Sequence, residues 1–121
     1  SEKLMTHGEQ KAETQFAVDL DGEGSSANVV SRSVARNDSY QMFRAKISGN
    51  NACAGHSECD AIIMDNARVC AIPELEANNL DAELIHEAAI GKIAGEHLIK
   101  LMTLGLTEEE AEEMIISGFL K

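Results

Sequence analysis

The sequence predicts a mainly β fold that ends in a pair of helices. Residues 12–20 alternate apolar and polar side chains, which is the period-2 pattern of a half-buried strand. Similar short segments recur along the chain, separated by turns rich in Gly, Asn and Asp. After residue 95 the apolar side chains change to helical spacing. These three observations assign the chain to the mainly β class with a helical C-terminus.

Six strands are expected from this pattern: 12–20, 27–34, 41–48, 58–64, 67–72 and 82–93. Pro73 either ends the fifth strand or places it at the edge of a sheet. Both an antiparallel sandwich and a parallel β-helix give short strands with regular polar turns. Tight two-residue hairpin turns are scarce, because only Asp21-Gly22 fits and it opens a longer loop. The pattern alone leaves both architectures open.

The C-terminal segment predicts a helical hairpin. Residues 95–104 form the first helix, and Gly105 is a typical residue to end it. Thr107 and Glu110 form a capping box that starts the second helix. The expected apolar face of that helix comprises Ala111, Met114, Ile115, Gly118 and Phe119. We therefore expect two parts, a β core over residues 1–93 and a hairpin over residues 94–121.

Composition limits the classes of partner. The chain has 121 residues, enough for one small domain or a piece of a larger protein, and a net charge of −11. That charge argues against a nucleic acid or an anionic membrane as partner. No apolar run approaches the roughly 18 residues of a membrane span. Three cysteines, without a signal sequence, do not indicate a disulfide framework and favour a reducing cytoplasm.

The cysteines allow several interpretations. Cys59 in a strand is either a small buried filler or a ligand. Cys53, His56 and Cys59 have the spacing of half a zinc site, but no second ligand pair follows, since Cys70 is the only further thiol. A thiol nucleophile with a histidine base is a third interpretation, although the sequence has no recognisable oxyanion hole or nucleophile elbow.

His86 and Glu87 form the second candidate group. Adjacent strand residues point to opposite faces, so both can join one site only at a strand end or an interface. Imidazole and carboxylate suit iron or zinc, and a thiolate suits iron–sulfur chemistry. The alternative for His86 is an ordinary hydrogen-bonded histidine.

Several segments together resemble the C-terminal part of the SufB/SufD family of iron–sulfur cluster assembly scaffolds. They are Glu-Cys-Asp at 58–60, Ile-Pro-Glu-Leu-Glu at 72–76, the Ile-His-Glu-Ala-Ala-Ile-Gly-Lys-Ile run at 85–93, and the helical segments 96–111 and 115–120. Residues 22–33 resemble the β-core of the same family. The resemblance covers about residues 20–121 and rests on the order and spacing of these segments taken together.

The resemblance implies a right-handed parallel β-helix followed by a C-terminal helical hairpin. It also implies that Cys59, His86 and Glu87 are ligands of a transiently bound iron–sulfur cluster, and that the chain is more SufB-like than SufD-like. Implied partners are a SufC-type ABC ATPase, docked by the C-terminal helices, and another SufB/SufD-like chain in a homo- or heterodimer. ATP hydrolysis would then lie in the partner, so the chain itself is not expected to be an enzyme.

The chain departs from the family pattern in three ways. It is far shorter than a usual member, aliphatic Leu98-Ile99 replace an expected aromatic pair, and a second family cysteine has no clear counterpart. We expect either a piece of a longer protein or a minimal homologue. A structural interaction module of the same complex, without its own metal site, is the alternative function.

Overall fold

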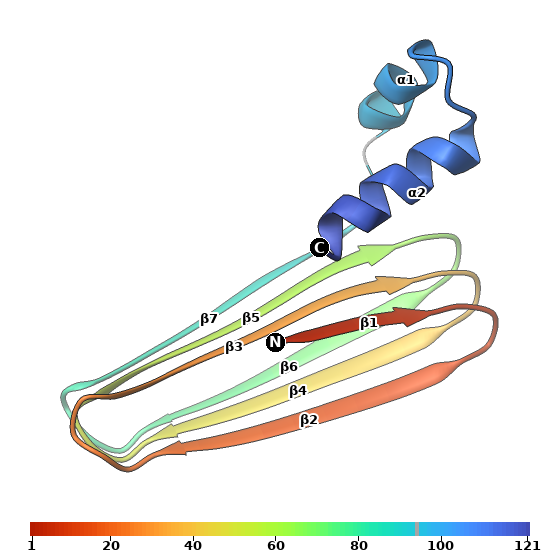
Figure 1. The fold of residues 1–121 in the computed structure, drawn as a ribbon. Coiled ribbons are helices and arrows are strands. Elements are labelled where there is room, and N and C mark those ends of the chain that lie inside the picture. The colour runs from red at the N-terminus through yellow and green to blue at the C-terminus, as the bar shows by residue number, and fades with distance from the viewer. Residues whose placement is uncertain (94) are drawn as a thin grey trace.

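The computed structural model of the protein describes residues 1–93 and 95–121, with seven strands followed by two helices in those residues. The elements are β1 Glu2–Thr6, β2 Lys11–Leu20, β3 Ser25–Ala35, β4 Tyr40–Gly49, β5 Cys53–Ile63, β6 Arg68–Ala77, β7 Ala82–Gly91, α1 Gly95–Thr103 and α2 Glu108–Phe119. One sheet has the order β1-β3-β5-β7 and the other β2-β4-β6, and every pairing is parallel (Figure 1). The chain therefore winds as a parallel β-helix, which confirms the predicted fold class and excludes the antiparallel sandwich.

Successive coils are nearly equal in length. Glu2 pairs with Ser31, Ser25 with Cys53, and Cys53 with Ala82. At one corner, Gly8, Asn37 and Asp65 occupy the equivalent position of successive coils, with φ angles of 60°, 59° and 58°. This left-handed conformation is costly for most residues but accessible to Gly, Asn and Asp. The corner sequence therefore sets where each coil turns.

The opposite corner is held by a side-chain ladder. Asn50 donates to the Asp21 carboxylate at 2.7 Å, and Asn78 donates to the Asn50 carbonyl oxygen at 2.7 Å. Each of these residues lies one coil beyond the last, so the polar turns recognised in the sequence also connect the coils.

Two details differ from the sequence prediction, and one is not tested. Strand β1 was not predicted, because Glu2–Thr6 offers only five residues of pattern. Strand β6 continues through Pro73, which lies opposite Ala45, and β6 is the last strand of its sheet in the described residues. The edge interpretation of Pro73 is thus confirmed, and the strand does not end there. The 94–121 hairpin prediction begins at Ala94, which lies outside the described residues, and the domain boundary stays a prediction.

The core lies between the two sheets and is made of small and aliphatic side chains. One cluster contains Leu20, Ile47 and Cys53, and a second contains Phe43, Ala45 and Cys59. Buried polar residues line the rest of the interior: Thr6, Ser31, Ser33, Ser39, Gln41, Ser48 and Ser57. Some of these pair with one another, since Thr6 donates to Ser39 at 2.9 Å and Gln41 donates to Thr6 at 2.9 Å.

Gly55 lies at a close approach of side chains from both sheets. A Cβ atom at this position would lie 2.9 Å from Ile47 Cγ2 and 2.9 Å from Leu84 Cδ2. Both distances are shorter than real Cβ contacts allow, so glycine is required by space. The contact also places Leu84 of β7 on the inner face of its sheet.

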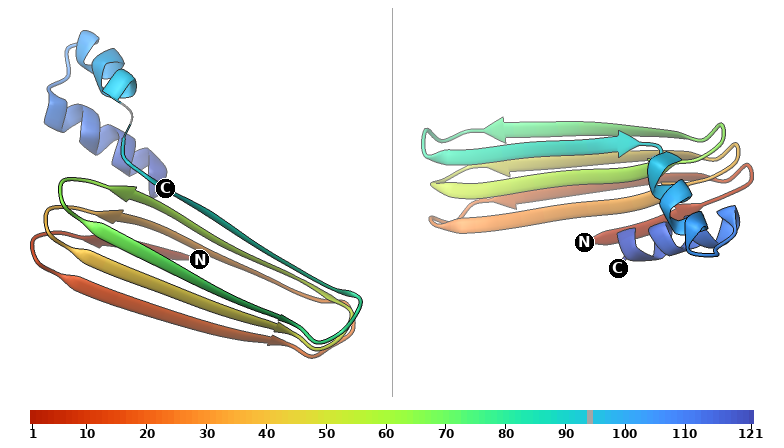
Figure 2. Two further views of the ribbon diagram at one scale, coloured as in Figure 1. Left: turned by 180° about the vertical axis from the view of Figure 1, so that it is seen from behind. Right: turned by 90° about the horizontal axis from the view of Figure 1, so that it is seen from above.

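The helices lie at the end of the β-helix where the odd-numbered strands finish (Figures 1 and 2). The predicted Thr107 cap is present, because the Glu110 backbone N–H donates to Thr107 Oγ1 at 3.2 Å. Arg36, directly after β3, forms an ion pair with Glu113 of α2 at 2.8 Å. Of the described residues, neither helix has the length and apolar character needed to cross a membrane.

The buried face of α2 agrees with the predicted one only in part. Of the predicted residues, Ala111 is buried and Ile115 and Phe119 are half-buried. Met114 is 54% exposed, and Ile116, which was not predicted on this face, is buried. The helix is therefore turned so that Ile116 meets the rest of the protein and Met114 faces solvent.

Candidate metal and thiol sites on strands β5 and β7

The pairing of β5 with β7 decides which candidate residues share a face. Ser57 lies opposite His86, and Glu58 lies opposite Glu87. Successive strand residues point to opposite faces. Because Ser57 is fully buried and Leu84 reaches the core, Cys59 and His86 lie on the inner face, whereas Glu87 lies on the outer face. The structure thus brings together two of the three predicted ligands and separates the third.

Cys59 is a buried thiol with a raised pKa. Its side chain is 1% exposed and contacts Phe43 and Ala45. Burial, with smaller contributions from the charges of Asp60 and Glu2, raises the pKa of Cys59 to about 11. The thiol is therefore protonated at neutral pH. An activated cysteine nucleophile needs the opposite, an exposed thiol with a lowered pKa, so this environment does not support the thiol-enzyme interpretation.

Two polar atoms next to Cys59 are buried without a hydrogen-bond partner in the part of the chain that the structure describes. They are Ser57 Oγ and His86 Nδ1, which belong to residues paired across β5 and β7. Buried polar atoms nearly always have a partner, so each such exception calls for a reason. Both atoms lie on the inner face that also carries Cys59.

Ser57 was not among the predicted site residues. Its position two residues before Cys59 places both on one face of a strand, and this spacing could have identified it.

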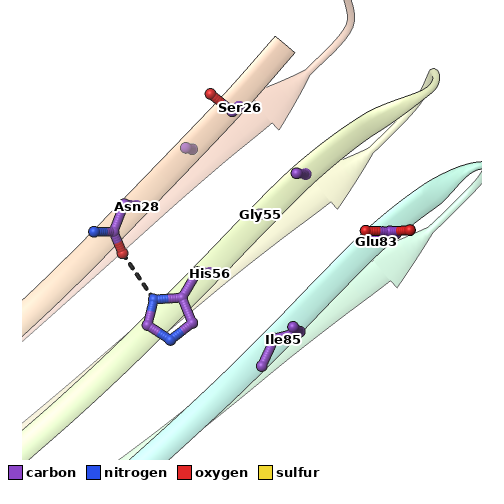
Figure 3. Close-up of a pocket in the computed structure, with 8 residues that line it drawn as sticks. Ser26, Asn28, Gly55, His56, Glu83 and Ile85 are labelled. Atoms are coloured by element: carbon purple, nitrogen blue, oxygen red, sulfur yellow. Dashed lines mark hydrogen bonds between the residues drawn. The ribbon is translucent and has the colours of Figure 1, made fainter. Parts of the chain in front are cut away.

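The outer face of the same strands carries a different cluster. One ligand atom each of His56, Glu58 and Glu87 lies within 4.8 Å of the others. His56 Nδ1 lies 2.8 Å from Asn28 Oδ1, and Figure 3 shows the ring turned toward that amide. The other ring nitrogen, Nε2, lies 3.5 Å from Glu87 Oε2.

Two further features lie on this outer face. Burial, together with the neighbouring Glu58, raises the pKa of Asp60, and Arg32 acts in the opposite direction. A surface pocket beside His56 is lined by residues that include Asn28, Glu83 and Ile85 (Figure 3). Acidic side chains thus dominate the outer face close to His56.

The fold does not support the zinc interpretation of Cys53, His56 and Cys59. The two cysteines are buried on the inner face of β5, whereas His56 points outward. Strand alternation therefore keeps the three side chains from converging on one ion. Cys53 instead belongs to the core cluster with Leu20 and Ile47.

Comparison with known families agrees with the resemblance seen in the sequence. A sequence model of the family described as "SUF system FeS cluster assembly, SufBD core domain" matches residues 2–119. The match includes both helices and every strand of the described fold.

Curated relatives carry the same family description. An iron-sulfur cluster assembly SufBD family protein of Methanothermobacter thermautotrophicus is 45% identical over 103 residues, which cover 84% of this chain and 25% of the relative. One of Pyrococcus horikoshii is 38% identical over 119 residues, covering 98% of this chain and 36% of the relative. One of Staphylococcus epidermidis is 38% identical over 100 residues, which cover 79% of this chain and 22% of the relative. The chain therefore spans about a quarter to a third of the length of these relatives.

Proposed function

This chain belongs to the SufBD family of iron–sulfur cluster assembly proteins, and from that premise we propose that it is a scaffold component that binds a nascent cluster. Family membership supports the coarser role in iron–sulfur cluster assembly. The finer proposal assigns Cys59, His86 and Glu87 as ligands of iron or sulfide. The cluster is the cargo of this process, formed on the protein and then passed on.

One observation carries the proposal. A buried thiol and a buried imidazole nitrogen lie on the same inner face, and two polar atoms there have no partner among the described residues. An apolar filler cysteine would require no such polar neighbours. Thiolate and imidazole are both ligands of iron–sulfur centres, and a mixed set should hold a cluster less tightly than four thiolates. Weaker ligation suits a protein that releases its product.

Glu87 would bind the cluster from the outer face of the sheet, not from the inner face that carries Cys59 and His86. It lies on the outer face of β7, which is the last strand of its sheet in the described residues. A second chain paired along this edge would place ligands from both chains around one shared position. Ile85 and Ile90 of β7 are 55% and 40% exposed, which supports an edge that a partner covers.

The C-terminal helices would dock the ATPase. Apolar side chains on and beside them are exposed: Ile99, Met102, Leu104 and Met114. Several exposed apolar side chains on one helical hairpin favour a protein partner. ATP hydrolysis would take place in that partner, which we propose to be a SufC-type ABC ATPase, in the cytoplasm.

A second candidate function is a structural module of the same complex that carries no cluster. The close contacts of Cys59 with Phe43 and Ala45 favour it, because free cysteine often serves as a small core residue.

Anaerobic reconstitution with iron and sulfide distinguishes the cluster-binding scaffold from the structural module. We expect a visible chromophore with bound iron in the wild type and in Cys70→Ser, since Cys70 lies on β6 in the other sheet. Cys59→Ser should lose the chromophore and the sulfide bound with it, and Ser57→Ala should lose part of both. An unchanged chromophore in Cys59→Ser would contradict the assignment of Cys59 as a cluster ligand. A wild type that forms no chromophore under any condition tested would favour the structural module. If the wild type shows no chromophore, the measurement is repeated with the ATPase and a second SufBD chain present.

A further inference from the structure

We propose that His56, Glu58 and Glu87 form a binding site for one divalent first-row metal ion, of the ferrous class, on the outer face of β5 and β7. His56 and Glu58 have no part in the cluster site proposed above, and the metal site does not need Cys59. Only Glu87 is shared between the two proposals.

The first support is convergence. His56 and Glu58 are two residues apart on β5, so they share a face, and Glu87 lies directly opposite Glu58 on β7. Their ligand atoms lie within 4.8 Å of one another. Metal–ligand bonds of about 2.0–2.2 Å would bring these atoms slightly closer, a change that side-chain torsions can supply. The backbone on both sides is already fixed by sheet pairing.

The second support is the orientation of the imidazole. Asn28 Oδ1 accepts from His56 Nδ1–H at 2.8 Å, which leaves the Nε2 lone pair for a metal. Metal-binding histidines almost always donate their other ring N–H to an oxygen acceptor in this way. Asn28 lies on β3, directly opposite His56. The ligand therefore has a partner outside the cluster that fixes its tautomer and its direction.

The third support is electrostatic. Glu58 and Glu87 are directly opposite in the ladder, and like charges in that position destabilise a sheet. His56 Nε2, 3.5 Å from Glu87, points toward this pair. A bound cation would remove the repulsion and use all three side chains at once.

The donor set selects the class of metal. One imidazole nitrogen and two carboxylate oxygens, without a thiolate, suit Fe²⁺, Mn²⁺, Co²⁺ or Zn²⁺ rather than Cu⁺. Ca²⁺ and Mg²⁺ prefer oxygen ligands alone. If the proposed function holds, iron is the relevant ion, held by oxygen and nitrogen on one face of the sheet while the thiol lies on the other.

Anaerobic titration with Co²⁺, followed by visible absorption, tests this site. We expect the wild type to bind one equivalent with d–d bands and without a thiolate-to-cobalt charge-transfer band. His56→Gln and Glu58→Gln should each weaken binding by more than about tenfold, and Asn28→Ala by about tenfold. Glu83→Gln is the matched control, because it removes an exposed carboxylate of β7 outside the cluster and should change nothing.

Cys59→Ser separates this proposal from the cluster proposal. It should leave the Co²⁺ titration unchanged while removing the reconstituted chromophore, and His56→Gln should do the reverse. Wild-type affinity equal to that of both His56→Gln and Glu58→Gln would overturn the site. So would a cobalt spectrum with a charge-transfer band that disappears in Cys59→Ser. Far-UV circular dichroism of each variant confirms that lost binding does not reflect lost folding.

Discussion

The inner and outer faces of β5 and β7 carry opposite chemistry one residue apart. The inner face holds Cys59, Ser57 and His86, where burial keeps the thiol protonated and leaves polar atoms without partners in the described chain. The outer face holds Glu58 and Glu87, which are more exposed and lie beside a hydrogen-bonded His56. The same two strands thus present a soft ligand on one side and hard ligands on the other.

This difference teaches how a β-helix separates chemical functions. Two groups joined by a single peptide bond can differ fully in burial, because the pleat directs them to opposite sides. His86, half-buried, and Glu87, exposed, are one case. The sheet therefore allows a buried, uncharged thiol and an exposed acidic cluster to lie close in sequence.

The largest expected change in stability comes from overpacking the inner face. Gly55→Val places a side chain where a Cβ alone would lie 2.9 Å from Ile47 and Leu84, so we expect a loss of about 3 kcal/mol in the free energy of unfolding. Ala54→Val, on the exposed side of the same strand, should change it by less than about 0.5 kcal/mol. Urea unfolding of the two variants measures both values. Equal losses would show that the two faces do not differ in packing.

The next effect concerns the thiol and pH. The pKa of Cys59 rises from 9.0 to about 11 in the folded protein, so the folded state keeps this proton when the unfolded state has lost it. Stability from this group is complete below about pH 9 and decreases as the pH rises through about 11, by roughly 2 to 3 kcal/mol.

Unfolding in urea from pH 8 to pH 11, about one unit per step, measures this loss against that of two variants. Cys59→Ser should flatten the decline, whereas Cys70→Ser should keep it. Identical pH profiles for wild type and Cys59→Ser would show that burial does not hold the proton on this thiol.

The smallest expected change in stability comes from removing one charge on the outer face. Without metal, Glu58→Gln removes the repulsion with Glu87 and should raise the free energy of unfolding by about 0.5 kcal/mol at low salt. The gain should shrink in high salt, because exposed charges are screened. Glu83→Gln is the control for loss of a carboxylate. A lower stability of Glu58→Gln in chelator-treated protein would contradict the proposed repulsion.

The sequence predicts much of the fold and part of the site. The alternation of residues 12–20 and the polar turns reveal strands, and adjacency alone predicts that His86 and Glu87 point apart. The sequence does not reveal which of the two points inward, since that depends on the register of β5 with β7. The same register brings Glu87 to His56 and Glu58, so periodicity within one strand could not have found that cluster.

The buried face of α2 is predicted only in part, for a related reason. Helical spacing correctly places Ala111 on the buried face but also places Met114 there, which is exposed, and omits Ile116, which is buried. The Arg36–Glu113 ion pair shows that the helix contacts the β-helix at specific positions. The choice is made by tertiary contacts with the β-helix, which local spacing does not contain.

The lengths of the coils decide whether odd- or even-numbered residues of a strand point into the core. Inward residues are odd-numbered in β5 and even-numbered in β7, because the coil from Cys53 to Ala82 is longer by a single residue than the preceding coil from Ser25 to Cys53. Deleting one residue of β7 before His86, with the corner pairing kept, would turn the carboxylate of Glu87 inward beside Ser57. Natural variation in coil length should therefore accumulate at the corners, where it leaves this odd–even assignment intact.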